Sequence, residues 1–386
     1  MRAAHIVGWS HTPFGRLADY SLEDLIVKVA QDALIDSGLE AKDIDAIFVG
    51  NFNGGLTREN FISSYALGAD PAFRFTPSTR IENACASGSA AIFAAMDAIS
   101  SGRIERALVI GAEKMTHLET AEVTECLARA AHLGEEYEKG LTFPGVFALF
   151  AKRYFERFGD VSQSLARIAV KNHSNGALNP LAHMQRELSF EFCNQVSEKN
   201  PMIAPPLRKT DCSLVSDGAA ALVLSSSAKG FARAVHLVST AQVNDFLPIS
   251  KRDPILFEGP RRAFDQALED ASITRSELSF AEIHDCFTIA ELLTYEAMEL
   301  APIGQGSRVI DEGISMRDGR LPINVSGGLK SKGHPIGATG VSMHVLAAMQ
   351  LVGEAGRLQL PKPNYGAVFN MGGSAVANYV TILKAS

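Results

Sequence analysis

Short apolar runs alternate with amphipathic segments over the first third of the chain. The apolar runs predict strands and the longer segments predict helices, because the two structures repeat their side chains with different periods. The predicted strands are His5 to Trp9, Ala46 to Gly50, Arg80 to Ala84 and Ala107 to Gly111, and the predicted helices are Leu22 to Ser37 and Ala86 to Ile99. Ser21 and Asp24 stand where a capping pair would open the first helix. This alternation predicts a largely parallel, buried sheet covered by helices.

The alternation breaks between residues 114 and 209. This segment is charged at first, rich in aromatic residues from Phe143 to Phe158, and it ends at Pro201, Pro205 and Pro206. We interpret it as a helical insertion that covers one side of a site, because long excursions from a compact domain are usually functional. A solvated helix face explains its basic residues, and contact with an anionic ligand is the alternative. The basic residues in question are Lys152, Arg153, Lys171, Arg208 and Lys209.

The second half of the chain repeats the plan of the first. The predicted strands are Ser216 to Leu224, Val235 to Val243, Phe280 to His284 and Leu321 to Val325; the helices are Gly259 to Ala271, Thr288 to Leu300 and Ile336 to Val352; a hairpin covers Tyr365 to Leu383. The run that begins at Ala33 recurs at Ala267, 234 positions later. We therefore expect two duplicated α/β halves, residues 1–113 with 210–232 and residues 233–386, around the insertion at 114–209. Ligands in such sheets bind at the carboxyl ends of the strands.

Composition excludes several classes of protein. Hydrophobic residues make up 46% of 386, which is enough for a large core. The net charge of -7 and the absence of a long Lys/Arg run argue against nucleic-acid binding. No uncharged apolar run is long enough to predict a membrane span, and no secretion signal is visible. The five cysteines are scattered and none lies in a CxxC spacing, which predicts a reducing, cytoplasmic location and no zinc site.

Cys85 stands between a predicted strand and a helix of small residues. A thiol at a helix N-terminus experiences the positive end of the helix dipole, which lowers its pKa and favours the nucleophilic thiolate. The alternative is a buried structural cysteine, the common fate of a lone Cys. The sequence therefore makes Cys85 a candidate nucleophile whose pKa we expect to be low.

Three further motifs follow predicted strands: His284 to Phe287, the glycine-rich loop Gly327 to Gly340 with His334, and Asn370 to Ser374. Making or breaking a carbon–carbon bond beside a thioester requires a nucleophile, a base, an acid/base group and donors for two oxyanions. Cys85, His334 and Cys286 can fill the first three roles. Structural alternatives exist: Asp285 as the cap of the helix near Thr288, and Lys330 and Lys332 as solvated turn residues.

The motifs NACASG at 83–88, SDGAAA at 216–221 and GHPIGATG at 333–340 resemble those of the thiolase family, in the same order and over nearly the whole chain. HDCF at 284–287 resembles the sterol-carrier-protein-type branch. The resemblance implies a thiolase-like fold of five layers, αβαβα. It also implies an acyltransferase of lipid and fatty acid metabolism that reversibly cleaves 3-oxoacyl-CoA to acetyl-CoA or propionyl-CoA and a shortened acyl-CoA, through an acyl-cysteine.

The resemblance also assigns roles to the candidate residues. Cys85 would be the acylated nucleophile, His334 its base, and Cys286 the acid/base group, because Asn370 replaces the catalytic cysteine of most thiolases. His284 and His334 would polarise the thioester oxygen of the enolate. The N–H groups of Cys85 and Gly372 would form the second oxyanion hole, and Asn370 would add a hydrogen bond.

Coenzyme A is expected as a co-substrate along the insertion, with no permanently bound cofactor. Family resemblance further implies a homodimer or a pair of dimers, and an accessory subunit is an open possibility. Two other functions remain alternatives: a retro-aldol or decarboxylating condensing enzyme on this fold, and a non-catalytic acyl-CoA-binding subunit. The presence of Cys85 argues against retro-aldol cleavage, and a second thiol argues against a binding subunit. Core packing explains Phe143, Phe147 and Phe150, with an acyl tunnel as the alternative.

Overall fold

Nine strands form one continuous sheet in the computed structural model, which describes residues 3–386. Met1 and Arg2, which the expected first half includes, lie outside the described residues. The order across the sheet is β3-β2-β4-β7-β1-β8-β11-β10-β9. The strands are β1 His5–His11, β2 Ala46–Gly50, β3 Ser78–Ile81, β4 Arg106–Glu113, β7 Gly218–Ser225, β8 Val235–Asn244, β9 Leu278–Ile283, β10 Tyr365–Gly372 and β11 Ala377–Ala385.

The strand order is nearly mirrored about the junction of β1 and β8. These two strands pair through only two positions, His5 with His236 and Ile6 with Val235. Outward from the junction lie β7, β4, β2 and β3 on one side and β11, β10 and β9 on the other. The two halves thus share the same order of parallel and antiparallel strand pairs, which agrees with the internal repeat in the sequence.

The predicted strand at Leu321 to Val325, the counterpart of β3, is wrong. This segment makes only an isolated parallel bridge, between Ile323 and Ala281 of β9. Asn324 has a left-handed backbone with φ of 57°, and its Oδ1 accepts from the N–H of Ile283 at 2.8 Å. The left-handed turn directs the chain away after one bridge, so that a strand cannot continue.

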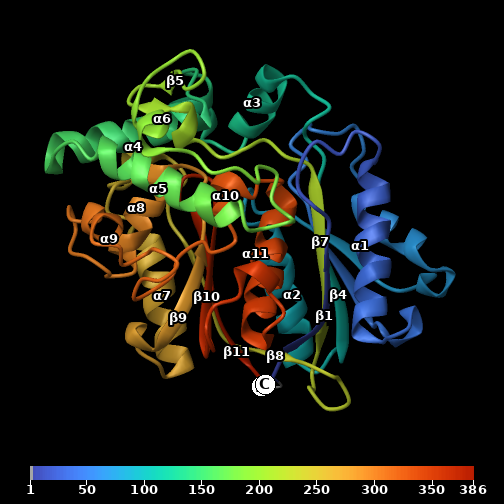
Figure 1. The fold of residues 1–386 in the computed structure, drawn as a ribbon. Helices are drawn as coiled ribbons and strands as arrows, with labels where there is room; N and C mark the ends of the chain where they lie inside the picture. Colours follow the sequence, from blue (N-terminus) through green and yellow to red (C-terminus); the bar gives the residue numbers. More distant parts are fainter. Residues whose placement is uncertain (1–2) are drawn as a thin grey trace.

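Two helices lie between the sheet halves, and other helices cover the outer faces (Figure 1). The central pair is α2 Ser87–Ser100 and α11 Ile336–Val352. On the outside, α1 Leu22–Ser37 covers the first half, whereas α7 Glu258–Ala271 and α8 Thr288–Ala297 cover the second. The result is the expected five-layer αβαβα arrangement.

Glycines allow the central helices to meet at backbone distance. A Cβ on Gly88 would lie 2.8 Å from the carbonyl oxygen of Gly337, and one on Gly340 would lie 2.4 Å from the amide nitrogen of Ser89. Both contacts are too short for any side chain. The glycines of NACASG and GHPIGATG therefore set how closely the two halves approach.

The repeat extends to the helix ends. The capping box of Ser21 and Asp24 opens α1 as expected, and Gly38 closes it in a left-handed conformation. Ser272, 234 positions after Gly38, closes α7 in the same conformation. Several predicted bounds shift by a few residues: β3 ends at Ile81, β9 at Ile283 and α8 at Ala297.

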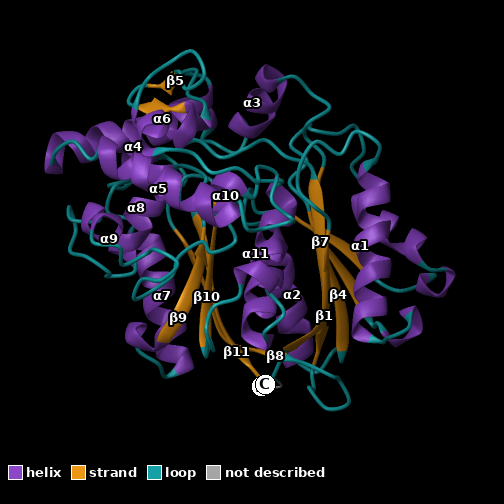
Figure 2. Ribbon diagram, in the orientation of Figure 1, coloured by secondary structure: helices purple, strands orange, loops and turns teal. Residues whose placement is uncertain are grey.

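The insertion forms a helical layer over one end of the sheet, at the top of Figure 2. It contains α3 Thr120–Ala128, the π-helical turn η4 Leu133–Tyr137, α4 Phe143–Phe158, α5 Ser162–Gly176, α6 Phe190–Asn194 and the ribbon of β5 Met202–Ala204 with β6 Leu207–Arg208. The remaining short helices are η1 Ala41–Asp43, η2 Ile62–Ala69, η3 Pro71–Phe73, η5 Lys209–Asp211, η6 Ile249–Lys251, η7 Arg275–Glu277, α9 Ser307–Asp311, α10 Gly328–Ser331 and η8 Gly356–Leu358. The domain boundaries at 113, 209 and 232 stay a prediction.

Two of the basic residues in the insertion are buried in internal ion pairs. Lys171 Nζ lies 2.7 Å from Glu291 Oε1, and Arg208 Nε lies 3.0 Å from Asp211 Oδ2. A solvated face does not explain these two residues, and neither faces an external anion, because their charges are already neutralised inside the protein. Within residues 3–386, no helix combines the length and the apolar character that a membrane crossing requires.

Candidate active site

Cys85 lies in a tight turn between β3 and α2. Ala84 has a left-handed φ of 49°, and Ala86 is the residue that precedes the first helical position. The Ser87 hydroxyl accepts from the N–H of Asn83 at 2.9 Å and donates to the carbonyl of Ala84 at 2.6 Å. The thiol therefore sits just outside the helix, one position earlier than expected, on a backbone that its neighbours hold in place.

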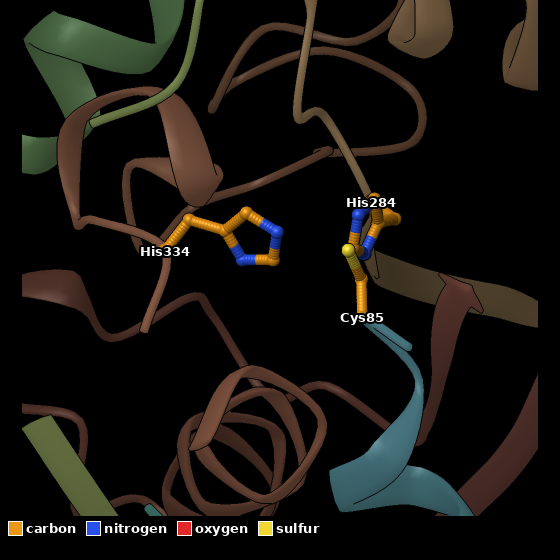
Figure 3. A group of neighbouring side chains, drawn as sticks. All are labelled: Cys85, His284 and His334. Atoms are coloured by element: carbon orange, nitrogen blue, oxygen red, sulfur yellow. The ribbon is translucent and has the colours of Figure 1, made fainter. Parts of the chain in front are cut away.

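Three predicted residues form a cluster. One ligand atom from each of Cys85, His284 and His334 lies within 4.8 Å of the other two. The two imidazole rings meet edge to face, with centroids 5.0 Å apart and an interplanar angle of 86°. Figure 3 shows His334 pointing toward Cys85 and His284. Cys85 follows β3 of the first half, whereas His284 follows β9 and His334 precedes α11 in the second half, so the cluster brings together loops from both halves.

The cluster borders a cavity of about 330 Å³. Cys85, His334 and Cys286 all line it, so both candidate thiols face one space. Its walls are mostly apolar; they include Phe52, Met115, Val123, Leu127, Phe143, Ile203, Phe287 and Ile336, together with the one lysine Lys209. The enclosed space thus suits an apolar group that reaches both thiols.

The three phenylalanines of α4 divide between core and cavity. Phe147 and Phe150 are fully buried, and Phe147 stacks on Phe287 with centroids 4.6 Å apart. Phe143 lines the cavity instead. The expected core role holds for the first two, whereas Phe143 takes the alternative position beside the site.

The expectation of a low pKa for Cys85 is wrong. Burial raises the pKa of its thiol to about 12, and the carboxylates of Glu113 and Glu82 also raise it. The backbone N–H of Gly373 faces the sulfur and has the opposite, smaller effect. Loss of water therefore outweighs the dipole of α2. Burial, reinforced by Lys332, lowers the pKa of His334 to about 3. At neutral pH the pair is a neutral thiol beside a neutral imidazole.

The other two groups are neutral for the same reason. Burial raises the pKa of the Cys286 thiol well above its ordinary value, with Cys85 and Asp285 adding to the effect. Burial, with His334 and Lys332, lowers the pKa of His284 well below its ordinary value. A reaction in this site must therefore create its charges by proton transfer between neutral groups.

The comparison with known proteins identifies the family. Residues 4–228 match the family model for the thiolase N-terminal domain, and residues 241–385 match the model described as thiolase C-terminal domain-like. The chain belongs to the thiolase family. This confirms the resemblance that the motifs predict.

Two relatives illustrate where this thiolase lies within the family. An acetyl-CoA acetyltransferase of Methanothermobacter thermautotrophicus is 36% identical over 380 residues, which cover 97% of each chain. Human sterol carrier protein 2 is 32% identical, over 100% of this chain and 72% of that protein. These relatives agree with an acyltransferase of the thiolase type.

Solved structures show the same fold. The Ltp2-ChsH2(DUF35) aldolase matches with a TM-score of 0.82 at 23% identity, over 99% of this chain and 98% of that chain. Human mitochondrial 3-ketoacyl-CoA thiolase in complex with CoA matches with a TM-score of 0.75 at 18% identity, over 100% and 98%. At these identities the likeness concerns architecture alone.

Asp285 of the thiolase does not cap α8, contrary to expectation. Phe287 precedes that helix and makes no side-chain cap. The Asp285 carboxylate is fully buried and accepts from the backbone N–H groups of Leu329 at 2.6 Å and Lys330 at 3.2 Å, and from Asn172 Nδ2 at 2.8 Å. Asp285 thus caps the short helix α10 and ties the His284 loop to the glycine loop.

Lys330 and Lys332 are buried, so the expectation of solvated turn residues is also wrong. Their exposed fractions are 3% and 0%, and Lys332 Nζ donates to Ser342 Oγ at 2.9 Å. The glycine loop folds inward beneath the insertion, which contacts it through α5. The nearby positive charge of Lys332 helps keep His334 neutral.

Sequence reasoning missed Glu113 as a part of the site. This buried carboxylate accepts from Asn51 Nδ2 at 2.8 Å and from the N–H groups of Phe52 at 2.9 Å, Asn53 at 3.1 Å and Gly337 at 3.0 Å. It connects the ends of β2 and β4 to the start of α11. The sequence does contain an indication, since Glu113 is an acidic residue at the end of the apolar run of β4. Only its burial in the structure distinguishes it from a surface carboxylate.

Proposed function

We propose that this thiolase reversibly cleaves 3-oxoacyl-CoA with coenzyme A, to give acetyl-CoA or propionyl-CoA and a shortened acyl-CoA. The observation that carries the proposal is the meeting of Cys85, His284 and His334 beside a cavity that Cys286 also lines. A nucleophile, a base, a donor and a second proton carrier are thus available to one substrate.

Cleavage begins when Cys85 Sγ attacks the 3-oxo carbon and its proton passes to His334. The 3-oxo oxygen becomes an oxyanion that the N–H groups of Cys85 and Gly372 stabilise. The bond between C2 and C3 then breaks, its electron pair remains on C2, and the thioester oxygen of the resulting enolate faces His284 and His334. Cys286 donates its proton to C2, which completes acetyl-CoA and leaves a Cys286 thiolate.

Acyl transfer to coenzyme A restores the resting enzyme. The thiol of coenzyme A gives its proton to the Cys286 thiolate and attacks the acyl carbon. Cys85 leaves as a thiolate and recovers its proton from His334. Each thiol and each imidazole ends in its starting protonation state, and the two half-reactions share one acyl-cysteine.

Coenzyme A acts here as a co-substrate, without a permanently bound cofactor, and Lys209 at the cavity is available to its phosphates. A cytoplasmic location agrees with five cysteines that are all free thiols. We further infer a homodimer or a pair of dimers in fatty acid metabolism. An accessory subunit is part of the proposal as well, since one neighbour of the same fold is named as a complex with a DUF35 partner.

Incubation with acetoacetyl-CoA tests this function. Without coenzyme A, we expect the intact mass of the protein to increase by one acetyl group, on the peptide that contains Cys85. With coenzyme A, we expect catalytic formation of two acetyl-CoA. Turnover without any acyl-enzyme would favour retro-aldol chemistry, and absence of both would favour a binding subunit that requires a partner.

A further inference from the structure

Asn370 of β10 contacts both His284 and the backbone of Cys85 through its side-chain amide. Asn370 Nδ2 lies 3.1 Å from the backbone carbonyl oxygen of Cys85 and 2.9 Å from His284 Nδ1. A carbonyl oxygen only accepts, so the group that faces it must be the amide NH2. Ser89 Oγ donates to Asn370 Oδ1 at 2.9 Å, which agrees with this orientation. The second amide hydrogen then points at His284 Nδ1.

His284 Nδ1 must therefore accept, and a neutral imidazole that accepts at Nδ1 carries its hydrogen on Nε2. His284 Nε2 is buried and has no hydrogen-bond partner among the described residues. A buried N–H without a partner is costly, and such groups persist where a ligand or substrate supplies the acceptor.

His334 has the opposite arrangement. Its Nδ1 lies 2.7 Å from Thr339 Oγ1, and that hydroxyl donates to the carbonyl of Pro335 at 2.9 Å. Because the hydroxyl hydrogen is directed to Pro335, the Thr339 oxygen accepts from His334 Nδ1. The hydrogen of His334 is then on Nδ1, and Nε2 has a free lone pair.

We propose that Asn370 and Thr339 hold the two imidazoles of the Cys85 cluster in opposite tautomers, so that His284 is an N–H donor, His334 is a base, and the cluster cannot bind a metal ion. Asn370 is thus a positioning residue that acts through His284. This inference rests on the proposed function only for the identity of the acceptor, which is the enolate oxygen.

The expectation that the cluster binds no metal ion follows from the hydrogen bonds of its two histidines. A thiolate and two imidazoles within 4.8 Å are ligands that Zn²⁺ and Co²⁺ favour. Nδ1 of His334 faces Thr339 and Nδ1 of His284 faces Asn370, so an ion held by both rings would need a lone pair on each Nε2. A metal-bound histidine usually donates its other N–H to an oxygen. Asn370 presents a donor to His284 Nδ1, where metal binding would require an acceptor.

The ¹⁵N spectrum of the wild-type chain with labelled histidine tests the tautomers directly. We expect His284 protonated at Nε2 and His334 protonated at Nδ1, with each signal assigned by its loss in His284→Asn and His334→Asn. His344 serves as an internal reference, because its Nδ1 faces the backbone carbonyl of Gly340 at 2.7 Å and must be protonated. The same tautomer in both site histidines would overturn the proposal.

Titration with Co²⁺ alone tests whether the cluster can bind a metal ion. Asn370→Asp gives His284 Nδ1 an acceptor and frees Nε2, so we expect this variant to gain a thiolate-to-cobalt absorption band that the wild type lacks. The band should disappear in Asn370→Asp with Cys85→Ser. Asn370→Leu, of similar shape but without an acceptor, is the matched control and should bind no cobalt. A band of equal strength in the wild type would overturn this expectation.

The half-reactions separate positioning from simple structural support. Asn370→Asp should lose carbon–carbon cleavage by on the order of 10²- to 10³-fold, the usual effect of one lost oxyanion donor. Acetyl transfer from acetyl-CoA to Cys85 does not use the enolate donor and should persist. Equal loss of both steps with a lowered melting temperature would reduce Asn370 to a structural role. If the wild type shows both tautomers but no thiolase turnover, the proposed function fails and the tautomer assignment stands.

Discussion

The two halves of the molecule place different chemistry on corresponding strand ends. After β2 and at the end of β4, Asn51 and Glu113 hydrogen-bond to each other and to the surrounding backbone, and the carboxylate accepts four N–H groups. After β9 and near the end of β10, His284 and Asn370 also hydrogen-bond to each other. Each pair has one buried atom without a partner among the described residues: the acceptor Asn51 Oδ1 in the first pair and His284 Nε2 in the second. One pair supports the site, whereas the other leaves a donor available to substrate.

Cys85 and Cys286 extend this comparison, since both line the cavity but come from different halves. Burial raises the pKa of both thiols, so a low pKa does not single out either as the nucleophile. Position identifies the nucleophile instead, because Cys85 belongs to the cluster with His284 and His334, and Cys286 does not.

Replacing Cys85 by Ser has the largest expected effect. Turnover of acetoacetyl-CoA with coenzyme A should fall by on the order of 10⁴-fold or more, because the covalent route is lost. The acetyl adduct should also be absent from the mass spectrum. An unchanged melting temperature would show that the fold is kept, and substantial residual turnover would contradict the assignment of the nucleophile.

Cys286→Ser should separate the two thiols. We expect Cys85 still to accept an acetyl group from acetyl-CoA, because coenzyme A can leave as a thiolate without the Cys286 proton. Carbon–carbon cleavage should fall by about 10²- to 10⁴-fold, because the proton carrier for C2 is lost. Rapid-quench measurement of each half-reaction would check this. Full cleavage activity in this variant would rule out Cys286 as the acid/base group.

His334→Asn should change how stability depends on pH. The folded-state pKa of about 3 lies below the ordinary 6.5, so the unfolded chain binds more protons and the wild type loses stability as pH falls below 6.5. The variant lacks this loss. The free energy of unfolding of the variant, taken relative to that of the wild type, should therefore rise by up to about 1.4 kcal/mol for each unit by which pH falls between 6.5 and 3. Denaturant unfolding at several pH values measures this, and a parallel pH dependence would contradict the lowered pKa.

Phe143→Ala should have the smallest effect and act on selectivity. Phe143 lines the cavity, so its removal should shift the preference toward longer or branched 3-oxoacyl-CoA substrates with little loss of stability. Phe147→Ala is the control, because deleting this fully buried ring should cost about 3 to 5 kcal/mol. An unchanged profile of rates across acyl lengths would place the acyl group elsewhere.

Local pattern predicts much of the fold because its causes are local. The capping box of α1 and the apolar run of β2 fix their own bounds, and α11 matches its predicted range. The aromatic-rich run from Phe143 to Phe158 coincides with α4. Leu321 to Val325 fails because Asn324 receives its left-handed conformation from a hydrogen bond to Ile283, 41 residues away. The repeat could be predicted, since it depends on matching segments rather than on contacts.

The members of the site were predictable, but their electrostatics were not. Their positions at strand ends and in family motifs predict that four residues share one site: Cys85, His284, Cys286 and His334. No local pattern reveals that Asp285 accepts from Leu329, or that Lys332 is fully buried. The pKa of Cys85 depends on how much water the insertion excludes, which is a property of the assembled layers.

The glycine contacts between α2 and α11 have a consequence for engineering. Cys85 lies two residues before the start of α2 and His334 two residues before the start of α11, so the backbone contact of Gly88 with Gly337 acts as a spacer between the sulfur and the imidazole. Side chains that face the acyl group take no part in that spacer. Acyl preference can therefore be redesigned around the cavity while the geometry of proton transfer is left intact, whereas a single methyl group added at Gly88 would disturb every substrate alike.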